Sequence, residues 1–280
     1  MDISASVWIS IVLISSAAGF AGSLLGLGGG FIVVPALTLL YGMDMRSAVG
    51  VSLIAVIATS SGSSVTYLKK TISNLELAAF LEISTVIGAV TSVFVADHIS
   101  PSLLFIGFSA VLVVSSMLML KKTYQKATFG TEHKFASPKG FHVRGEYLDH
   151  DGERVAYVTR RNWLGFGISG IAGLISGLLG VGGGVIKVPT MNLVMGVPIK
   201  AATATSNLMV GMTAATSAIL MFARGEIPLQ ISALVAIGVF IGARAGSRQL
   251  QGASPRTISW VFVVFALFIS YQMFLKGLAA

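Results

Sequence analysis

Two glycine-rich stretches inside strongly apolar sequence constrain this chain more than any other feature. Gly26–Gly30 reads Gly-Leu-Gly-Gly-Gly and Gly180–Gly184 reads Gly-Val-Gly-Gly-Gly, and a proline, Pro35 or Pro189, follows five residues after each run. Glycine costs a helix about 1 kcal/mol relative to alanine and frees backbone groups that lipid cannot satisfy. Such a break is tolerated at membrane depth only where the backbone is buried in protein or lines a wet cavity.

The composition places these breaks in a membrane protein. The 280 residues are 54% hydrophobic and 11% charged, whereas a soluble domain carries about 25% charged residues. The formal charge is +8, but the basic residues lie in short segments between apolar spans, which is typical of orientation signals and not of a nucleic-acid interface. Cysteine is absent, the four histidines are scattered, and no span carries a paired carboxylate or a His-Glu-x-x-His motif. We therefore expect no enzyme activity, no metal site and no cofactor.

The apolar segments come in two sets of five. In each set the second segment is too short to cross a hydrocarbon core of about 30 Å, and we expect it to be a short helix that begins inside the membrane at the glycines. The expected segments are Val7–Leu25, Phe31–Tyr41, Ala48–Leu68, Leu75–Ala96 and Pro101–Leu120, and then Trp163–Leu179, Val185–Met195, Ala201–Phe222, Leu229–Leu250 and Pro255–Phe274.

A polar segment, residues 121–162, separates the two sets. Its second part holds two β-prone runs on either side of Asp149-His150-Asp151-Gly152, and Asp-Gly between such runs predicts a hairpin. The expected organisation is a first membrane repeat over 1–120, a cytoplasmic insert with a β-hairpin over 121–162, and a second membrane repeat over 163–280.

The two sets are related by a single offset of 154 residues. Both glycine runs, both prolines, the pair Ser52 and Ser206, and Ser100-Pro101 with Ser254-Pro255 keep this offset over more than seventy positions without a gap. An internal duplication is the expected cause.

Loop charges indicate how the repeats face the membrane. The positive-inside rule places Lys69-Lys70 and the basic insert in the cytoplasm and both termini outside. The predicted fold is therefore an all-α polytopic membrane protein of two five-segment repeats with inverted topology. If the short segments are re-entrant, each half has four spans and the repeats run parallel.

Two helices that begin at glycine breaks would present unpaired N–H groups and positive dipole ends, which together form an anion site in a transporter. Close helix crossing is the alternative role for these glycines. The candidate binding residues are Gly28, Gly29, Gly30, Gly182, Gly183 and Gly184.

Two ionisable residues fall inside expected spans. Lys187 follows the second glycine run by three residues, where the first half has Val33, and its expected role is countercharge to an anion. Glu82 lies seven residues into its span and is the candidate for proton exchange. The alternatives are that the lysine snorkels or pairs with a carboxylate, and that Glu82 is its partner or lines a vestibule.

Hydroxyl residues repeat on one helix face in each half. Ser52, Thr59 and Ser63 in the first half correspond to Ser206, Thr213 and Ser217 in the second. Ser52, Ser206 and the neighbouring amide of Asn207 are candidate donors to an oxyanion, and interhelical packing is the alternative.

The two glycine motifs with their prolines, together with Thr203-Ala204-Thr205-Ser206-Asn207, resemble the TauE/SafE family of membrane transporters, also called the sulfite exporter family. The resemblance spans roughly residues 15–120 and 163–274. It implies secondary export of a small sulfur-containing anion (sulfite, sulfonate or sulfoacetate class) across the cell membrane, coupled to protons. A passive anion channel, or a transporter of the same fold for a different small anion, remains the alternative, and the oligomeric state, a homo-oligomer included, stays open. Lys187 and Glu82 rest on the physical argument alone.

Overall fold

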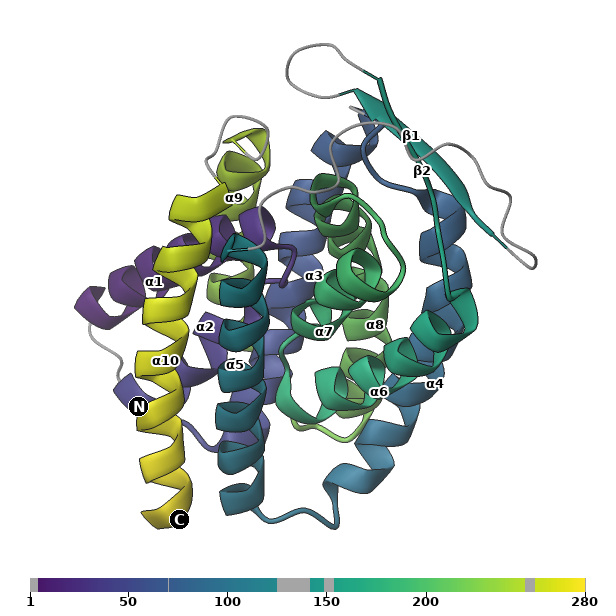
Figure 1. The fold of residues 1–280 in the computed structure, drawn as a ribbon. Coiled ribbons are helices and arrows are strands. Elements are labelled where there is room, and N and C mark those ends of the chain that lie inside the picture. Colours follow the sequence, from purple (N-terminus) through teal and green to yellow (C-terminus); the bar gives the residue numbers. More distant parts are fainter. Residues whose placement is uncertain (1–4, 70, 125–141, 149–153, 250–254, 280) are drawn as a thin grey trace.

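The computed structural model describes residues 5–69, 71–124, 142–148, 154–249 and 255–279 as a helical bundle with a small β-hairpin at one end (Figure 1). Six of the described helices are long and apolar enough to cross a membrane. The long helices are α1 (Ala5–Leu25), α3 (Met45–Lys69), α4 (Leu75–Ala96), α5 (Pro101–Tyr124), α6 (Asn162–Leu179), α8 (Ile199–Ala223), α9 (Leu229–Gln249) and α10 (Pro255–Ala279).

Helix ends differ from the expected spans where polar residues extend them. Helix α3 begins at Met45, three residues before the expected Ala48, because the Asp44 carboxylate accepts hydrogen bonds from the backbone N–H groups of Arg46 (3.0 Å) and Ser47 (3.2 Å). Helix α5 continues to Tyr124, past the apolar run. Hydropathy locates the span, whereas capping and backbone propensity set the helix ends.

Each short segment begins as an α-helix and ends as a π-helix. An α-helical stretch, α2 (Gly30–Pro35) or α7 (Gly184–Pro189), continues into a π-helical turn, η1 (Ala36–Leu40) or η2 (Thr190–Val194). Proline has no N–H to donate to the preceding turn, so the regular α-helical pattern changes at this point. The offset of 154 is kept in the structure, since both copies change helix type directly after the proline.

Helices at equivalent positions of the two halves run antiparallel. Along α5 and α10, Gly277 lies beside Ser102, whereas the Ser109 hydroxyl is 2.8 Å from that of Ser270. The same holds for α3 and α8, where Ser60 lies beside Gly211 and Gly50 lies beside Met221. Helix α1 packs along α9, and the equivalent helix α6 packs along α4.

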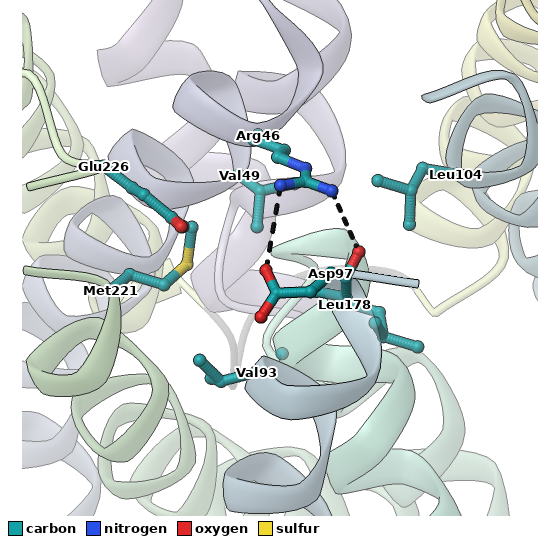
Figure 2. A pocket seen from close by; sticks show the side chains of 10 residues that line it. Arg46, Val49, Val93, Asp97, Leu104, Leu178, Met221 and Glu226 are labelled. Atoms are coloured by element: carbon teal, nitrogen blue, oxygen red, sulfur yellow. Dashed lines mark hydrogen bonds and ion pairs between the residues drawn. The ribbon is translucent and has the colours of Figure 1, made fainter. Parts of the chain in front are cut away.

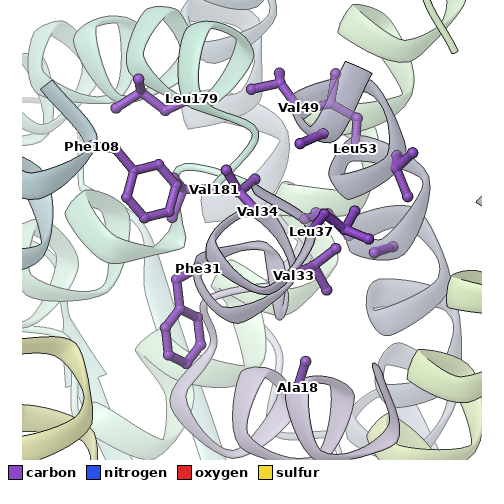
Figure 3. Close-up of a cluster of buried hydrophobic side chains, with 14 of the residues drawn as sticks. Ala18, Phe31, Val33, Val34, Leu37, Val49, Leu53, Phe108, Leu179 and Val181 are labelled. Carbon is purple, nitrogen blue, oxygen red and sulfur yellow. The ribbon is translucent and has the colours of Figure 1, made fainter. Parts of the chain in front are cut away.

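The short helix α2 lies in the centre of the main hydrophobic cluster (Figure 3). Phe31 and Val34 are buried and pack among α3, α5 and the second glycine loop, which contribute Val49, Phe108 and Val181. The broken backbone is thus covered by protein, as membrane burial requires.

The outward faces of the long helices are apolar. On α4, Ile83, Ile87 and Phe94 are exposed, whereas Glu82 is buried. An exposed apolar face on a polytopic bundle is the surface that lipid covers. The orientation of α4 therefore separates lipid-facing side chains from an ionisable group inside the bundle.

The predicted hairpin is present as strands β1 (Arg144–Leu148) and β2 (Arg154–Val158), paired antiparallel with Arg144 opposite Val158. The predicted Asp-Gly turn lies outside the described residues. The hairpin packs on the end of the bundle where α3 ends and α4 begins, since Asn74 donates to the Arg144 carbonyl (3.0 Å) and the Tyr157 hydroxyl (3.2 Å).

Candidate functional site

The two glycine loops meet, backbone against backbone, in the middle of the bundle. A Cβ added to Gly30 would lie 2.1 Å from the Gly180 carbonyl oxygen, and one added to Gly184 would lie 2.0 Å from the Gly26 carbonyl oxygen. The contact is reciprocal, because Gly26 and Gly180 hold the same position in their repeats. Only glycine permits this approach at both positions.

The loops also need glycine for their backbone angles. Gly28 and Gly29 have φ of 81° and 74°, and Gly182 and Gly183 have φ of 77° and 70°. Side chains other than glycine rarely adopt these angles. Each loop therefore turns the chain from a long helix into the first turn of the short helix, α2 or α7.

The predicted hydroxyl and amide residues hold these loops. The Ser52 hydroxyl donates to the Gly180 carbonyl (2.6 Å), and the Ser206 hydroxyl donates to the Gly26 carbonyl (2.9 Å). The Asn207 amide donates to the Ser23 carbonyl at the end of α1 (2.9 Å). These donors satisfy carbonyls that the broken helices leave without intrahelical partners. In this structure their partners are backbone carbonyls, which matches the packing alternative for Ser52 and Ser206.

The Asn207 side chain is not fully used by these contacts. Its Oδ1 atom is buried and has no hydrogen-bond partner within the described part of the chain. Leaving a buried acceptor without a hydrogen bond costs free energy, so an unpaired oxygen next to the first glycine loop calls for an explanation. It lies on α8, the helix that also carries Ser206.

Lys187, Thr213 and Glu82 form a buried polar chain beside the second loop. The Lys187 ammonium donates to the Thr213 hydroxyl (2.7 Å), which donates to Glu82 Oε1 (2.7 Å). Lys187 Nζ is also 3.6 Å from Glu82 Oε2, and the two side chains are 0% and 4% exposed. The alternative in which the lysine pairs with a carboxylate is thus the arrangement in this structure.

This polar chain has no counterpart in the other half. The positions equivalent to Lys187, Thr213 and Glu82 are Val33, Thr59 and Ala236. Thr59 instead donates to the Gly28 carbonyl of its own loop (3.0 Å). The two loops are therefore alike in backbone and different in charge.

Sequence reasoning found the two ends of this chain of contacts and missed the bridge. Thr213 appeared only as a member of a repeated hydroxyl face. Its spacing from Ser206 placed it on the correct face of α8, but Glu82 lies on another helix and 131 residues away. No sequence pattern identifies such a contact.

Paired broken segments that meet inside a polytopic helical bundle, beside a buried ion pair, define a membrane transporter architecture. The profile of the Sulfite exporter TauE/SafE family matches residues 11–273. This chain belongs to that family, as its glycine motifs predicted.

Similar proteins cover the same length. The probable membrane transporter protein YunE of Bacillus subtilis is 23% identical over 278 residues, which cover 97% of this chain and 98% of YunE. The probable membrane transporter protein MJ0441 of Methanocaldococcus jannaschii is 26% identical, with 92% of this chain and 94% of MJ0441 covered. No solved structure matches this chain.

Proposed function

We propose that this chain is a secondary transporter that exports a small sulfur-containing anion (sulfite, sulfonate or sulfoacetate class) from the cell together with protons. The anion binds between the two glycine loops, near the membrane midplane. The observation that carries this proposal is the buried Lys187–Thr213–Glu82 chain beside the second loop. The family name, sulfite exporter, supports the substrate class and the direction.

Inverted repeats supply the movement. The antiparallel packing of α5 with α10, and of α3 with α8, supports repeats that are related by an axis in the membrane plane. Such repeats can rock against each other and expose one central site to each side in turn. The positive-inside rule then puts the hairpin end in the cytoplasm and both termini outside.

The loops must separate for an anion to bind between them. Gly30 and Gly184 pack against carbonyls of the opposite loop, so the structure corresponds to a closed arrangement of the two repeats. Separation would uncover the first N–H groups of α2 and α7, which favour negative charge.

Glu82 and the anion compete for Lys187. When Glu82 is ionised, it neutralises the lysine and the anion has no countercharge. When Glu82 takes up a proton, its charge is lost and Lys187 can pair with the anion. Proton and anion therefore bind together and move in the same direction, which makes transport of a monovalent anion electroneutral. Export follows whenever the outward anion gradient exceeds the inward proton gradient.

Flux into proteoliposomes tests the function. We expect uptake of at least one of sulfite, thiosulfate, methanesulfonate and sulfoacetate, accompanied by proton uptake reported by a trapped pH dye. An imposed pH gradient should drive accumulation above the external concentration, which a passive channel cannot achieve. Absence of flux for every sulfur anion, in protein that transports another small anion, would contradict the substrate class.

A further inference from the structure

A second charged cluster, which Figure 2 shows in close-up, lies where α3 begins and α4 ends, at the end of the bundle opposite the hairpin. It surrounds a small cavity of about 20 Å³ between the two repeats. Its lining residues include Arg46, Val49, Asp97, Leu178 and Glu226.

Two guanidinium groups share the Asp97 carboxylate, which lines this cavity. Arg46 also lines the cavity, whereas Arg224 binds Asp97 from outside the lining. Arg224 donates to Asp97 Oδ2 (2.8 Å) and to the Val93 carbonyl (3.2 Å). Arg46 lies 3.8 Å from Asp97 Oδ1 and donates to the Ala96 carbonyl (3.2 Å), as Figure 2 shows. Guanidinium groups arranged around one carboxylate also suit a sulfonate or another small oxyanion.

The cluster joins the two repeats and leads toward the second glycine loop. Arg46 and Asp97 belong to the first repeat and Arg224 to the second. On the inner side, Val49 packs against Gly180, the residue that begins the second loop. An anion held by the arginines would therefore stand between the outer surface of the bundle and the proposed central site.

The carboxylate is specific to this end of the molecule. The offset of 154 pairs Arg46 with Lys200, Arg224 with Lys70, and Asp97 with Gln251. The sequence thus keeps basic residues at both sets of positions but has an acidic residue in only one. The Asp97 carboxylate therefore has no counterpart at the equivalent position of the second half.

We propose that Arg46 and Arg224 form a terminal recognition site for the transported anion, in which the Asp97 carboxylate occupies the position of the anion until it is displaced. The cavity of about 20 Å³ has room for about one water, so an oxyanion enters only when Asp97 turns outward. The Asp97 side chain is 46% exposed, which leaves it a path to solvent. With Asp97 turned out, both guanidinium groups lose their carboxylate partner, and one monovalent anion replaces its charge. This site deepens the proposed function and rests on it for the identity of the anion.

The chain has no cysteine, so one introduced thiol can report on the cavity. Leu178→Cys is placed in the cavity wall of purified protein. Its modification is timed with (2-sulfonatoethyl) methanethiosulfonate, a sulfonate, and with the cationic trimethylammonioethyl reagent of similar size. Methanesulfonate is the unreactive competitor.

Asp97→Asn in this background should speed modification by the sulfonate reagent about tenfold relative to the cationic reagent, because the arginines lose their resident carboxylate. Methanesulfonate should slow modification saturably, at lower concentration than with Asp97 present. Replacing both arginines with glutamine should abolish this protection. Glu226→Gln is the matched control, since it removes the same charge from the same cavity. Glu226 forms no salt bridge within the described ranges, so a small change is expected.

Equal acceleration of both reagents by Asp97→Asn, without saturable protection, would mean that the cluster is only a latch between the repeats, and the proposal would be wrong. If Asp97→Asn does not give monodisperse protein, the variant with both arginines replaced by glutamine decides. Undiminished methanesulfonate protection in that variant would also overturn the site. These readouts report binding and not transport. Protection of Leu178→Cys in a protein that moves no sulfur anion would leave this site standing and remove the proposed function.

Discussion

Lys187 Nζ lies 3.6 Å from Glu82 Oε2, and the hydroxyl of Thr213 bridges the same two side chains, in a part of the bundle that solvent does not reach. Moving two charges out of water costs free energy that their mutual attraction often does not recover. A buried ion pair is therefore weak evidence for a purely stabilising role. Its position beside one glycine loop, and the apolar residues Val33 and Ala236 at the equivalent positions, favour a role in the transport cycle.

The pair predicts a strongly non-additive mutant cycle. Glu82→Gln and Lys187→Met should each destabilise the protein by about 3–5 kcal/mol if the remaining partner stays charged, whereas the double variant should recover most of this loss. Thermal unfolding in detergent measures the cycle. Additive losses would show that the two side chains are not coupled.

The same substitutions separate coupling from binding. Glu82→Gln should retain anion flux but lose its response to an imposed pH gradient, because the side chain no longer exchanges a proton. Lys187→Met should weaken anion binding itself, measured directly on purified protein. Retained pH-driven accumulation in Glu82→Gln would remove Glu82 from the coupling step.

Thr213 should matter through its hydroxyl and not through its size. Thr213→Val removes the bridge between Lys187 and Glu82, and we expect slower proton-coupled flux. Thr213→Ser keeps the hydroxyl and should behave like the natural protein. Thr59→Val is the matched control at the equivalent position, where the hydroxyl donates to the Gly28 carbonyl and contacts no charge. Flux that is lowered equally by both valine variants would indicate a structural role.

The loop contact predicts which glycines tolerate a methyl group. Gly30→Ala and Gly184→Ala place a Cβ about 2 Å from a backbone carbonyl of the other loop and should abolish flux. Gly167→Ala is the control, because nothing lies within 4 Å of its Cβ on an exposed helix face, and it should be neutral or stabilise by up to about 1 kcal/mol. Wild-type flux from both loop variants would contradict a tight contact between the two glycine loops.

Asn74 links the hairpin to both repeats and should contribute measurably to stability. Its Oδ1 accepts from the Leu77 N–H (2.9 Å) as the N-cap of α4, and its backbone N–H donates to the Thr205 hydroxyl (3.0 Å). Asn74→Ala should cost about 2 kcal/mol, since it removes the cap and the two bonds to the hairpin. Asn74→Asp keeps the cap acceptor and removes only the amide donor, so it should cost less. An equal loss in both variants, measured by thermal unfolding, would assign the whole effect to the hairpin contact.

Much of the architecture follows from local sequence. The glycine loops, the short helices after them and the hairpin strands were all predicted, because glycine permits backbone angles that other residues avoid, whereas proline and β-branched residues restrict the backbone where they stand. The π-helical turn after Pro35 and the early start of α3 at Met45 were not predicted. A proline indicates that the α-helical hydrogen-bond pattern breaks but not which type of turn follows, and the early start depends on one capping carboxylate.

Individual residues of the candidate site were named from the sequence, but most of their contacts were not. Lys187 and Glu82 were found because an ionisable residue in an apolar span is conspicuous, but either could have faced a vestibule. Ser52 and Ser206 were predicted to donate to an oxyanion, and in the structure their hydroxyls donate to carbonyls of the opposite loop. The shared carboxylate of Asp97 was missed, because loop charges had been interpreted only as orientation signals.

The sequence by itself determined that this is a membrane protein of the TauE/SafE family with two glycine breaks related by an offset of 154 residues. Composition, periodicity and backbone preferences are local properties, so they can be obtained from the order of residues alone. Only the tertiary structure decided that Glu82 faces Lys187 and that Arg46 and Arg224 share Asp97. These contacts join helices far apart in the chain. They depend on the rotation and crossing of packed helices, which close glycine contacts set and which no local pattern records.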